Sequence, residues 1–311
     1  MAEIQLDHLK ELIKKDPVSC IKKADSEYLG AIEGVVAELE ERGANIVLLA
    51  GPSSSGKTTT ACLMRDILHS RGHKAIIVSL DDFYRDKDDP DYPIDEQGNQ
   101  DYESIDALHV DKIRECICDL LSGRDVYLPK YIFERGASVI SVEPIRLGEG
   151  DVVIMEGIHA LNPIITGGLD NDRIIKMFIS VSTNINDGEK RILSGKKIRF
   201  IRRMTRDSIY RGTGADATLA RWVSVLSGED KYLYPYRGDA DFQINTFHNY
   251  ELAIMKPFAL RSLELSRGKL SGDYIEVVIS ALQRFDALER AYLPEESLIC
   301  EFVPGGKYEN L

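Results

Sequence analysis

The chain has 311 residues, of which 43% are hydrophobic and 29% are charged, and its formal net charge is −12. This length is ample for one large α/β core. The negative charge argues against a general nucleic-acid-binding surface. The longest apolar runs are far too short to span a membrane, and no signal peptide precedes the first expected helix. We therefore expect a cytoplasmic protein that binds neither nucleic acid nor membrane, while a homo-oligomer stays open.

The spacing of the cysteines agrees with the expected cytoplasmic location. The five cysteines stand at positions 20, 62, 116, 118 and 300, and they form no C-x-x-C pair and no zinc-ligand spacing. Reduced thiols in a cytoplasmic protein are the simplest interpretation.

The first expected unit is a helical lead-in over residues 1–43. Ile32, Val35, Val36 and Leu39 fall at i, i+3, i+4 and i+7, which is helical spacing. Pro17 breaks the region into two helices, and Gly43 ends the second one. We expect this lead-in to contribute packing rather than chemistry.

The most informative segment follows, at residues 51–58. Its sequence, G-P-S-S-S-G-K-T, matches G-x-x-x-x-G-K-[ST] at every fixed position. The apolar run at residues 46–50 predicts a buried parallel strand before it, and residues 59–71 have helical spacing after it. A Gly/Ser-rich turn could match by chance, but strand, loop and helix occur here in the required order.

This phosphate-binding loop predicts an ATP site. Its glycines let backbone N–H groups turn towards a phosphate chain, and the helix N-terminus adds partial positive charge. Lys57 should reach the β and γ phosphates, and Thr58 should hold Mg²⁺. The predicted nucleotide-binding residues are Gly51, Ser53, Ser54, Ser55, Gly56, Lys57, Thr58 and Thr59.

Beyond the loop, strands and helices alternate. Strands are expected at residues 74–80, 151–156, 174–181 and 241–246, and a hairpin at 125–146. Helices are expected at residues 105–123, 186–230 and from 247 to about 290. The polar stretch 81–101 is either a functional loop or disordered. This order predicts a doubly wound, mainly parallel α/β sheet.

Two acids stand at expected strand ends, where open α/β sheets bind their ligands. Asp81 follows the second strand, where a carboxylate can accept a proton from an attacking hydroxyl. Glu156 follows four apolar residues, which is the arrangement of an acid that orients Mg²⁺ beside the loop threonine. The structural alternative for both is a cap on the following turn.

Arginines form a stripe on one expected helix. Arg199, Arg202, Arg203 and Arg206 fall at i, i+3, i+4 and i+7, and Arg211 lies just beyond. A solvated, salt-bridged face is the usual explanation. Guanidinium groups also suit a phosphoryl group in transfer, so we expect at least two of them to face phosphate.

A polar stretch opens the next expected helix. Residues 100–107 read Q-D-Y-E-S-I-D-A and combine a tyrosine, acids and a helix start. An acid here could accept hydrogen bonds from sugar hydroxyls, while Ser104 could serve only as an N-cap. Both roles can hold at once.

Taken together, these motifs resemble the uridine kinase/phosphoribulokinase family. Over residues 44–265 the chain carries, in order, G-P-S-S-S-G-K-T, S-L-D-D-F-Y-R, D-Y-E-S-I-D-A-L, L-P-K-Y-I-F, V-V-I-M-E-G-I-H-A-L-N-P and R-R-M-T-R-D. The sequence of these motifs is most similar to the kinase portion of long-form bacterial uridine kinase-like proteins. The resemblance implies a P-loop kinase fold with a helical lid, a kinase domain over residues 44–290 and a C-terminal tail over residues 291–311.

The resemblance also implies roles for single residues. Asp81 matches the catalytic carboxylate, and Arg206 and Arg211 match lid arginines that close on the phosphates. Glu103 stands where the family has an Asp that contacts ribose hydroxyls. The remaining acceptor contacts would be Tyr84, Tyr131 and Phe133.

The nucleobase motif departs from the family pattern. Ile132 replaces an Asp, and Glu134, Arg135 and Gly136 stand where a His is expected. We therefore expect an ATP- and Mg²⁺-dependent kinase that phosphorylates a small-molecule hydroxyl, in the first place the 5′-OH of a nucleoside. A kinase of another polyol or sugar phosphate, and an ATP-binding regulator without turnover, stay open.

Overall fold

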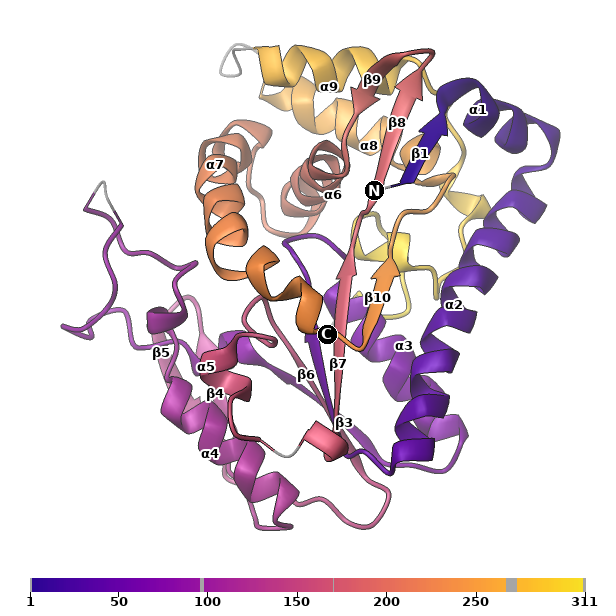
Figure 1. Cartoon of the computed structure of the whole chain (residues 1–311). Helices are drawn as coiled ribbons and strands as arrows, with labels where there is room; N and C mark the ends of the chain where they lie inside the picture. Colours follow the sequence, from indigo (N-terminus) through magenta and orange to yellow (C-terminus); the bar gives the residue numbers. More distant parts are fainter. Residues whose placement is uncertain (1, 96–97, 170, 267–272, 310–311) are drawn as a thin grey trace.

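The computed structural model describes the chain apart from residues 1, 96–97, 170, 267–272 and 310–311. Five parallel strands form the central sheet in the order β10-β7-β2-β6-β3 (Figure 1). They are β2 (Ile46–Ala50), β3 (Ala75–Ser79), β6 (Val152–Glu156), β7 (Ile174–Ser180) and β10 (Phe242–Asn245). From β2 the chain first forms the edge strand β3, returns to form β6 between them, and then continues to β7 and β10 on the other side of β2, so the predicted doubly wound parallel sheet is confirmed.

Helices cover both faces of this sheet. Val47 and Leu49 of β2 lie in the core beneath α2, α3, α6 and α8, whereas Ile46 and Leu48 lie in the core beneath α4 and α5. Burial on both faces explains why this strand is a continuous apolar run. The helices are α1 (Leu6–Lys15), α2 (Pro17–Arg42), α3 (Lys57–Ser70), α4 (Val110–Leu121), α5 (Pro163–Thr166), α6 (Gly195–Tyr210), α7 (Ala215–Tyr232), α8 (Glu251–Leu265) and α9 (Asp273–Gln283).

The expectation that the first residues are helical is wrong. Ala2–Gln5 forms β1, which pairs in parallel with β8 (Thr183–Asp187). A four-residue strand carries no usable periodicity, and its partner lies about 180 residues away in the sequence. The helices α1 and α2 follow as predicted, with Pro17 as the first residue of α2.

The prediction of a helix at residues 186–230 placed its start too early in the sequence. Residues 183–193 form a hairpin of β8 and β9 (Lys190–Leu193), and α6 starts at Gly195. The two loop residues are Gly188 and Glu189, between the paired residues Asp187 and Lys190, and Gly188 has a φ of 59°. Glycine at the first position of a two-residue loop is typical of a hairpin turn, because that position has a positive φ, and this signal outweighs the helical pattern.

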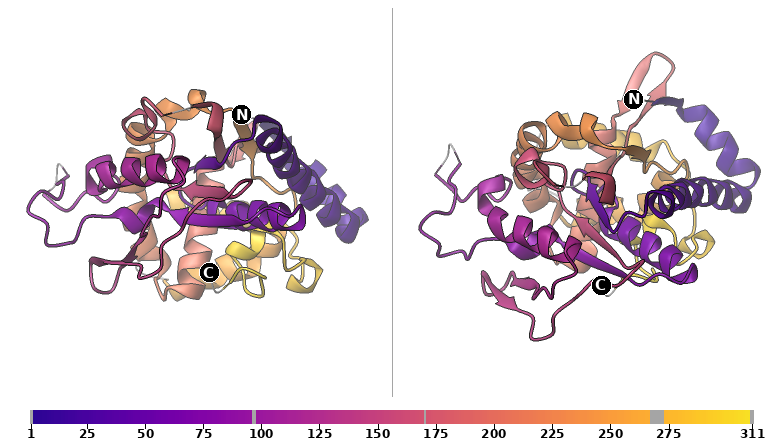
Figure 2. Two further views of the ribbon diagram at one scale, coloured as in Figure 1. Left: turned by 90° about the horizontal axis from the view of Figure 1, so that it is seen from below. Right: turned by 60° about the horizontal axis from the view of Figure 1, so that its bottom comes forward.

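The polar stretch after β3 is held in place rather than disordered over its described residues. Arg85 N–H bonds to Ala107 O and Lys87 N–H to Gly136 O, at 2.8 Å and 2.7 Å. It therefore packs beside the predicted hairpin, which is present as β4 (Pro129–Ile132) and β5 (Ala137–Ile140). Figure 2 shows α2 on the opposite side of the molecule from this stretch. The next helix, α4, starts at Val110, after a 3-10 turn at Ile105–Ala107.

No helix in the described part of the chain is both long and apolar enough to cross a membrane.

A polar cluster joins the N-terminal helices to the C-terminal residues. The Tyr250 hydroxyl donates to Asp25 Oδ1 on α2, and the Ser297 hydroxyl lies 3.3 Å from the same oxygen. Burial raises the pKa of Asp25 from 3.8 to about 6, against the lowering effect of these two hydrogen bonds. His248 Nε2 lies 3.4 Å from Asp25, but burial lowers the pKa of His248 to about 3, so this ring is neutral and does not balance the charge.

Asp25→Asn should stabilise the protein at alkaline pH. A carboxyl with a raised pKa favours folding below its unfolded pKa, and that contribution is lost as pH rises through about 6. The variant should therefore gain about 1–2 kcal/mol in free energy of unfolding at pH 8 and little at pH 4, as measured by urea denaturation. Asp16→Asn, at the exposed N-cap of the same helix, should show no such gain. Equal stabilisation at both pH values would contradict a raised pKa of Asp25 in the folded protein.

Candidate active site

The phosphate-binding loop lies between β2 and the N-terminus of α3, at the carboxyl edge of the sheet. Gly56 has a φ of 95°, and Ser54 is the only described non-glycine residue with a positive φ, at 56°. A Cβ atom at Gly51 would lie 2.5 Å from Ile179 O, so only glycine permits this approach to β7. The glycines are thus required by the geometry of the loop.

Arg199 on α6 binds the loop from inside the protein. Its Nη1 donates to Ser53 O at 2.9 Å, and the guanidinium makes two 2.7 Å hydrogen bonds to Glu229 on α7. Glu229 also accepts the Ser53 N–H at 2.9 Å. Both charged side chains are almost fully buried, so this pair fixes one residue of the loop through its N–H and its carbonyl.

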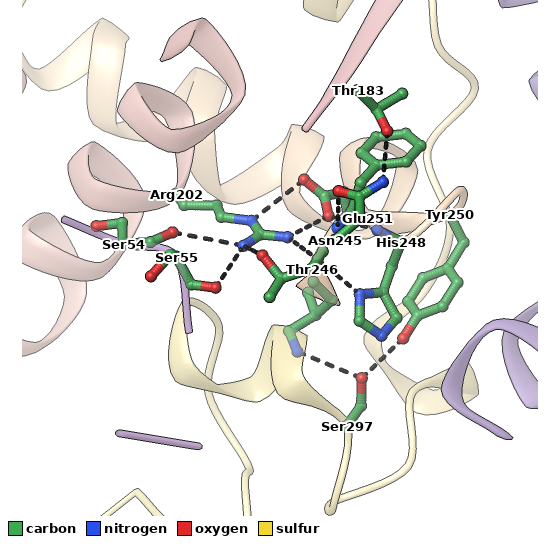
Figure 3. Close-up of polar contacts among 12 residues, drawn as sticks. Ser54, Ser55, Thr183, Arg202, Asn245, Thr246, His248, Tyr250, Glu251 and Ser297 are labelled. Carbon is green, nitrogen blue, oxygen red and sulfur yellow. Dashed lines mark hydrogen bonds and ion pairs between the residues drawn. The ribbon is translucent and has the colours of Figure 1, made fainter. Parts of the chain in front are cut away.

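Arg202, one helical turn further along α6, also binds the loop from inside the protein (Figure 3). Its Nη1 reaches Ser54 O and Ser55 O at 3.4 Å and 3.5 Å. Its Nε and Nη2 bind Glu251, and Nη2 also donates to Thr246 O. Arg202 and Glu251 are both 0% exposed. The inner half of the predicted arginine stripe therefore binds loop carbonyls and does not face the phosphate side.

The outer half of the stripe is closer to solvent. Arg203 Nη1 donates to the Ser53 hydroxyl at 2.8 Å. Arg206 and Arg211 both pair with Asp207, each at 3.3 Å, and Arg211 is 57% exposed. These two are the arginines predicted to meet the phosphates, and the structure places them at the open end of α6.

The inner surface of the loop is ready for an anion. The Lys57 ammonium folds back onto Gly51 O at 3.0 Å, while Thr58 is exposed at the start of α3. Among the described residues, the buried hydroxyls of Ser54 and Ser55 have no hydrogen-bond partner. Unpaired buried donors beside a helix N-terminus suit the oxygen atoms of a phosphate chain.

Glu156 ends β6 next to this loop, as predicted. Burial raises the pKa of this carboxyl from 4.5 to about 7, Lys57 opposes the shift, and Asp81 adds to it. The Ser79 hydroxyl donates to it at 3.3 Å. Within the described residues, no group of three His, Cys, Asp or Glu side chains could hold a metal ion. One carboxylate and one hydroxyl suit Mg²⁺, which usually completes its shell with water and phosphate oxygens.

The two neighbouring aspartates after β3 face different partners. Asp82 accepts the Tyr131 N–H at 3.2 Å and pairs with Lys130, so it ties β4 to the sheet edge. Asp81 is exposed, and its backbone N–H bonds to the Ser79 hydroxyl. Desolvation by the surrounding protein raises the pKa of Asp81, Lys57 opposes this shift most strongly, and Asp82 adds to it. This places Asp81 within electrostatic reach of the loop lysine.

Aromatic rings gather beside Asp81. The Tyr84 ring lies 5.7 Å from Tyr131 and 6.4 Å from Phe133, and those two lie 5.0 Å apart. Tyr102 contacts Tyr84 at 6.4 Å. The Phe133 ring is 66% exposed. The three predicted aromatic acceptor residues therefore form one cluster, in which Tyr131 is buried and Phe133 is exposed and available for stacking.

Glu103 packs against Gly228 of α7. A Cβ atom at Gly228 would lie 2.4 Å from Glu103 Cβ, so the glycine allows the two segments to touch. Burial raises the pKa of Glu103 from 4.5 to about 7, and Arg203 opposes this. Ser104 accepts the Asp106 N–H at 3.2 Å, which confirms its capping role.

Sequence reasoning missed three acids that contact the loop, the helix after it or its arginines. Glu229, Glu251 and Glu301 belong to different elements, and no local pattern marks them. Glu229 stands in the S-G-E stretch of α7, so its position after a helical glycine was the sole signal available.

This arrangement defines a phosphotransferase of the P-loop class. The model of the phosphoribulokinase/uridine kinase family matches residues 46–253, and the chain belongs to this family. A uridine kinase of Halobacterium salinarum is 30% identical over 200 residues, covering 63% of this chain and 77% of that protein. A Staphylococcus aureus uridine kinase is 28% identical over 219 residues, covering 68% and 93%. The chain is thus an ATP-dependent kinase.

Solved structures give more distant matches. A putative fructose transport system kinase from Silicibacter sp. TM1040 is 18% identical, with a TM-score of 0.45, over 70% of this chain and 98% of that one. A possible uridine kinase from Bacillus stearothermophilus is 19% identical, with a TM-score of 0.36, over 44% and 70%.

Arg202→Met should destabilise the fold. The change leaves the Glu251 carboxylate buried without its partner, which costs about 3–5 kcal/mol. Arg211→Met, at the C-terminal end of the same helix and 57% exposed, should change the free energy of unfolding by less than about 1 kcal/mol. Urea denaturation of both variants measures this difference, and the double variant Arg202→Met/Glu251→Leu should recover much of the loss. Equal losses for the two single variants would mean that the buried pair does not hold α6.

Proposed function

We propose that the protein transfers the γ-phosphoryl group of Mg²⁺-ATP to the 5′-OH of a nucleoside. The observation that supports the proposal is that Asp81 follows β3 at the sheet edge that carries the phosphate loop, while its neighbour Asp82 accepts the N–H of Tyr131 in the aromatic cluster. The electrostatic influence of Lys57 on the pKa of Asp81 supports proximity on one side. The influence of Asp81 on the pKa of Tyr84 supports it on the other.

The donor half of the proposed site is the phosphate-binding loop. Lys57 and the loop amides would hold the β and γ phosphates, and the hydroxyl of Thr58 and the carboxylate of Glu156 would hold Mg²⁺. The metal would neutralise charge on the phosphate oxygens. Arg206 and Arg211 would bind the transferring group, because guanidinium groups match its planar oxygen arrangement.

The acceptor half centres on Asp81. The acceptor hydroxyl oxygen forms the new bond to the γ phosphorus, the bond to the β–γ bridging oxygen breaks, and ADP leaves. The hydroxyl proton passes to the Asp81 carboxylate. A pKa raised by the surrounding protein makes this carboxylate a better proton acceptor. Glu103 would accept hydrogen bonds from the ribose hydroxyls, and the Phe133 ring would stack against the base, with Tyr84 and the buried Tyr131 packed beside it.

Asp81→Asn should reduce acceptor phosphorylation by about 100-fold or more, because the amide cannot take a proton. ATP affinity should hardly change, since Asp81 serves the acceptor. Asp82→Asn is the matched control: its amide oxygen can still accept the Tyr131 N–H, so activity should fall much less. The measurement is ADP release with a panel of nucleosides, sugars and polyols, beside an ATP titration.

Each outcome of that panel has a distinct meaning. Loss of ATP binding in Asp81→Asn would move this residue to the metal site. Turnover with sugars or other polyols but with no nucleoside would replace the nucleoside assignment. ATP binding without turnover on any acceptor would favour a regulator.

Phe133→Ala should raise the KM for a nucleoside by about fivefold to tenfold, because one aromatic contact contributes about 0.5–1.5 kcal/mol. The effect on kcat should be small, since the ring would contact the base and not the reacting hydroxyl. Val142→Ala changes another exposed apolar side chain near the hairpin and should leave KM unaltered. Steady-state kinetics at saturating ATP would measure KM and kcat for the nucleoside in both variants. An unchanged KM in Phe133→Ala would remove this ring from the acceptor site.

A further inference from the structure

The C-terminal residues pack against the phosphate loop, although the family match ends at residue 253. A 3-10 turn at Leu298–Glu301 lies at the start of α3. Leu298 Cδ1 lies 2.6 Å from the point where Gly56 would carry a Cβ atom. The segment 298–309 is therefore a wall of the loop that the family pattern does not describe.

Glu301 places a carboxylate on two groups that the nucleotide is expected to use. Its Oε2 accepts from the Thr59 hydroxyl at 3.1 Å and from the Thr59 backbone N–H at 3.4 Å. Its Oε1 lies 3.5 Å from Arg206 Nη1. Thr59 is in the first turn of α3, where the helix dipole favours an anion. The carboxylate thus binds as a phosphate oxygen pair would.

A cavity of about 280 Å³ adjoins this carboxylate. The loop side contributes Thr58 and Thr59, and α6 contributes Arg206 and Arg211. The opposite wall is the C-terminal segment, including Glu301 and Tyr308. An open space therefore exists next to the groups that Glu301 holds, into which a bound nucleotide can extend.

Hydrogen bonds fix the segment on α3 after Glu301. Lys307 Nζ and the Tyr308 hydroxyl both donate to Asp66 Oδ2 on α3 at 2.8 Å. Arg290 binds Pro304 O and Gly305 O at 2.5 Å and 2.6 Å. These contacts hold the segment in place, so the Glu301 side chain is kept at the loop.

We propose that Glu301 is an internal competitor for the phosphate chain of the nucleotide. Arg206 directs Nε and Nη2 to Asp207 and only Nη1 to Glu301. Because Glu301 occupies this Nη1 and the Thr59 N–H, a nucleotide phosphate that uses the same donors must displace the carboxylate. Glu301 thereby lowers the affinity of the empty site for polyphosphates. The inference rests on the proposed donor site and adds a determinant of its affinity.

Glu301→Gln tests this directly. The amide keeps the shape but not the charge, so the binding of ATP and of inorganic tripolyphosphate should tighten about tenfold, the size of one charge-assisted hydrogen bond. Glu309→Gln is the matched control, because Glu309 lines the same cavity and bonds to Gly305 N–H instead. Calorimetric titration without an acceptor gives the Kd values, and thermal unfolding verifies that all variants are folded.

The outcomes separate the two proposals. An unchanged or weaker Kd in Glu301→Gln would overturn the competition, as would tighter binding of ATP without tighter binding of tripolyphosphate. A gain that appears equally in Glu309→Gln would also overturn it, because general charge would then be the cause. If neither the parent protein nor any variant binds ATP, the proposed donor site is wrong. The proposed competition by Glu301 is then wrong as well.

Discussion

The site depends on two buried guanidinium groups that hold the carbonyl oxygens of the phosphate loop. Arg199 binds Ser53 O, and Arg202 reaches Ser55 O. In a trans peptide the carbonyl and the following N–H point in opposite directions. A loop whose carbonyls are drawn towards α6 therefore directs the N–H groups of Ser54 and Gly56 away from it, where an anion can bind. Arginine, with five donors and a permanent charge, suits this task better than any other side chain.

The same arrangement limits how the helices can move. Each arginine is paired with an acid on another helix, Glu229 on α7 and Glu251 on α8. Breaking one such buried pair costs about 3–5 kcal/mol, so α6 cannot tilt as a rigid body at low cost. Closure over a phosphoryl group would then involve the end of α6 near Arg206 and the turn at Arg211, which lie outside these pairs.

Local patterns predicted what depends on neighbouring residues. The strand, loop and helix around Lys57, the acids at two strand ends and the hairpin near Tyr131 all have signals within a few residues. Contacts between distant segments had none: β1 pairs with β8, and Glu301 reaches Thr59 from 242 positions away. Helical spacing placed the arginines on one face. It could not show that Arg202 meets a fully buried acid while Arg206 meets Asp207 and Glu301, because these contacts depend on α8 and on the C-terminal segment.

Residues from the N-terminal helix α2 and from the C-terminal segment both bind the N-terminal turn of α3. Tyr28 of α2 shares a 2.5 Å hydrogen bond with the Thr60 hydroxyl, which also donates to Gly56 O at 2.6 Å. From the other side, Glu301 satisfies the Thr59 N–H. A helix N-terminus left bare would carry unpaired donors, so an internal carboxylate stabilises the empty state. Any ligand must then offer more negative charge than one carboxylate to take its place, and a polyphosphate chain does so while a monoanion does not.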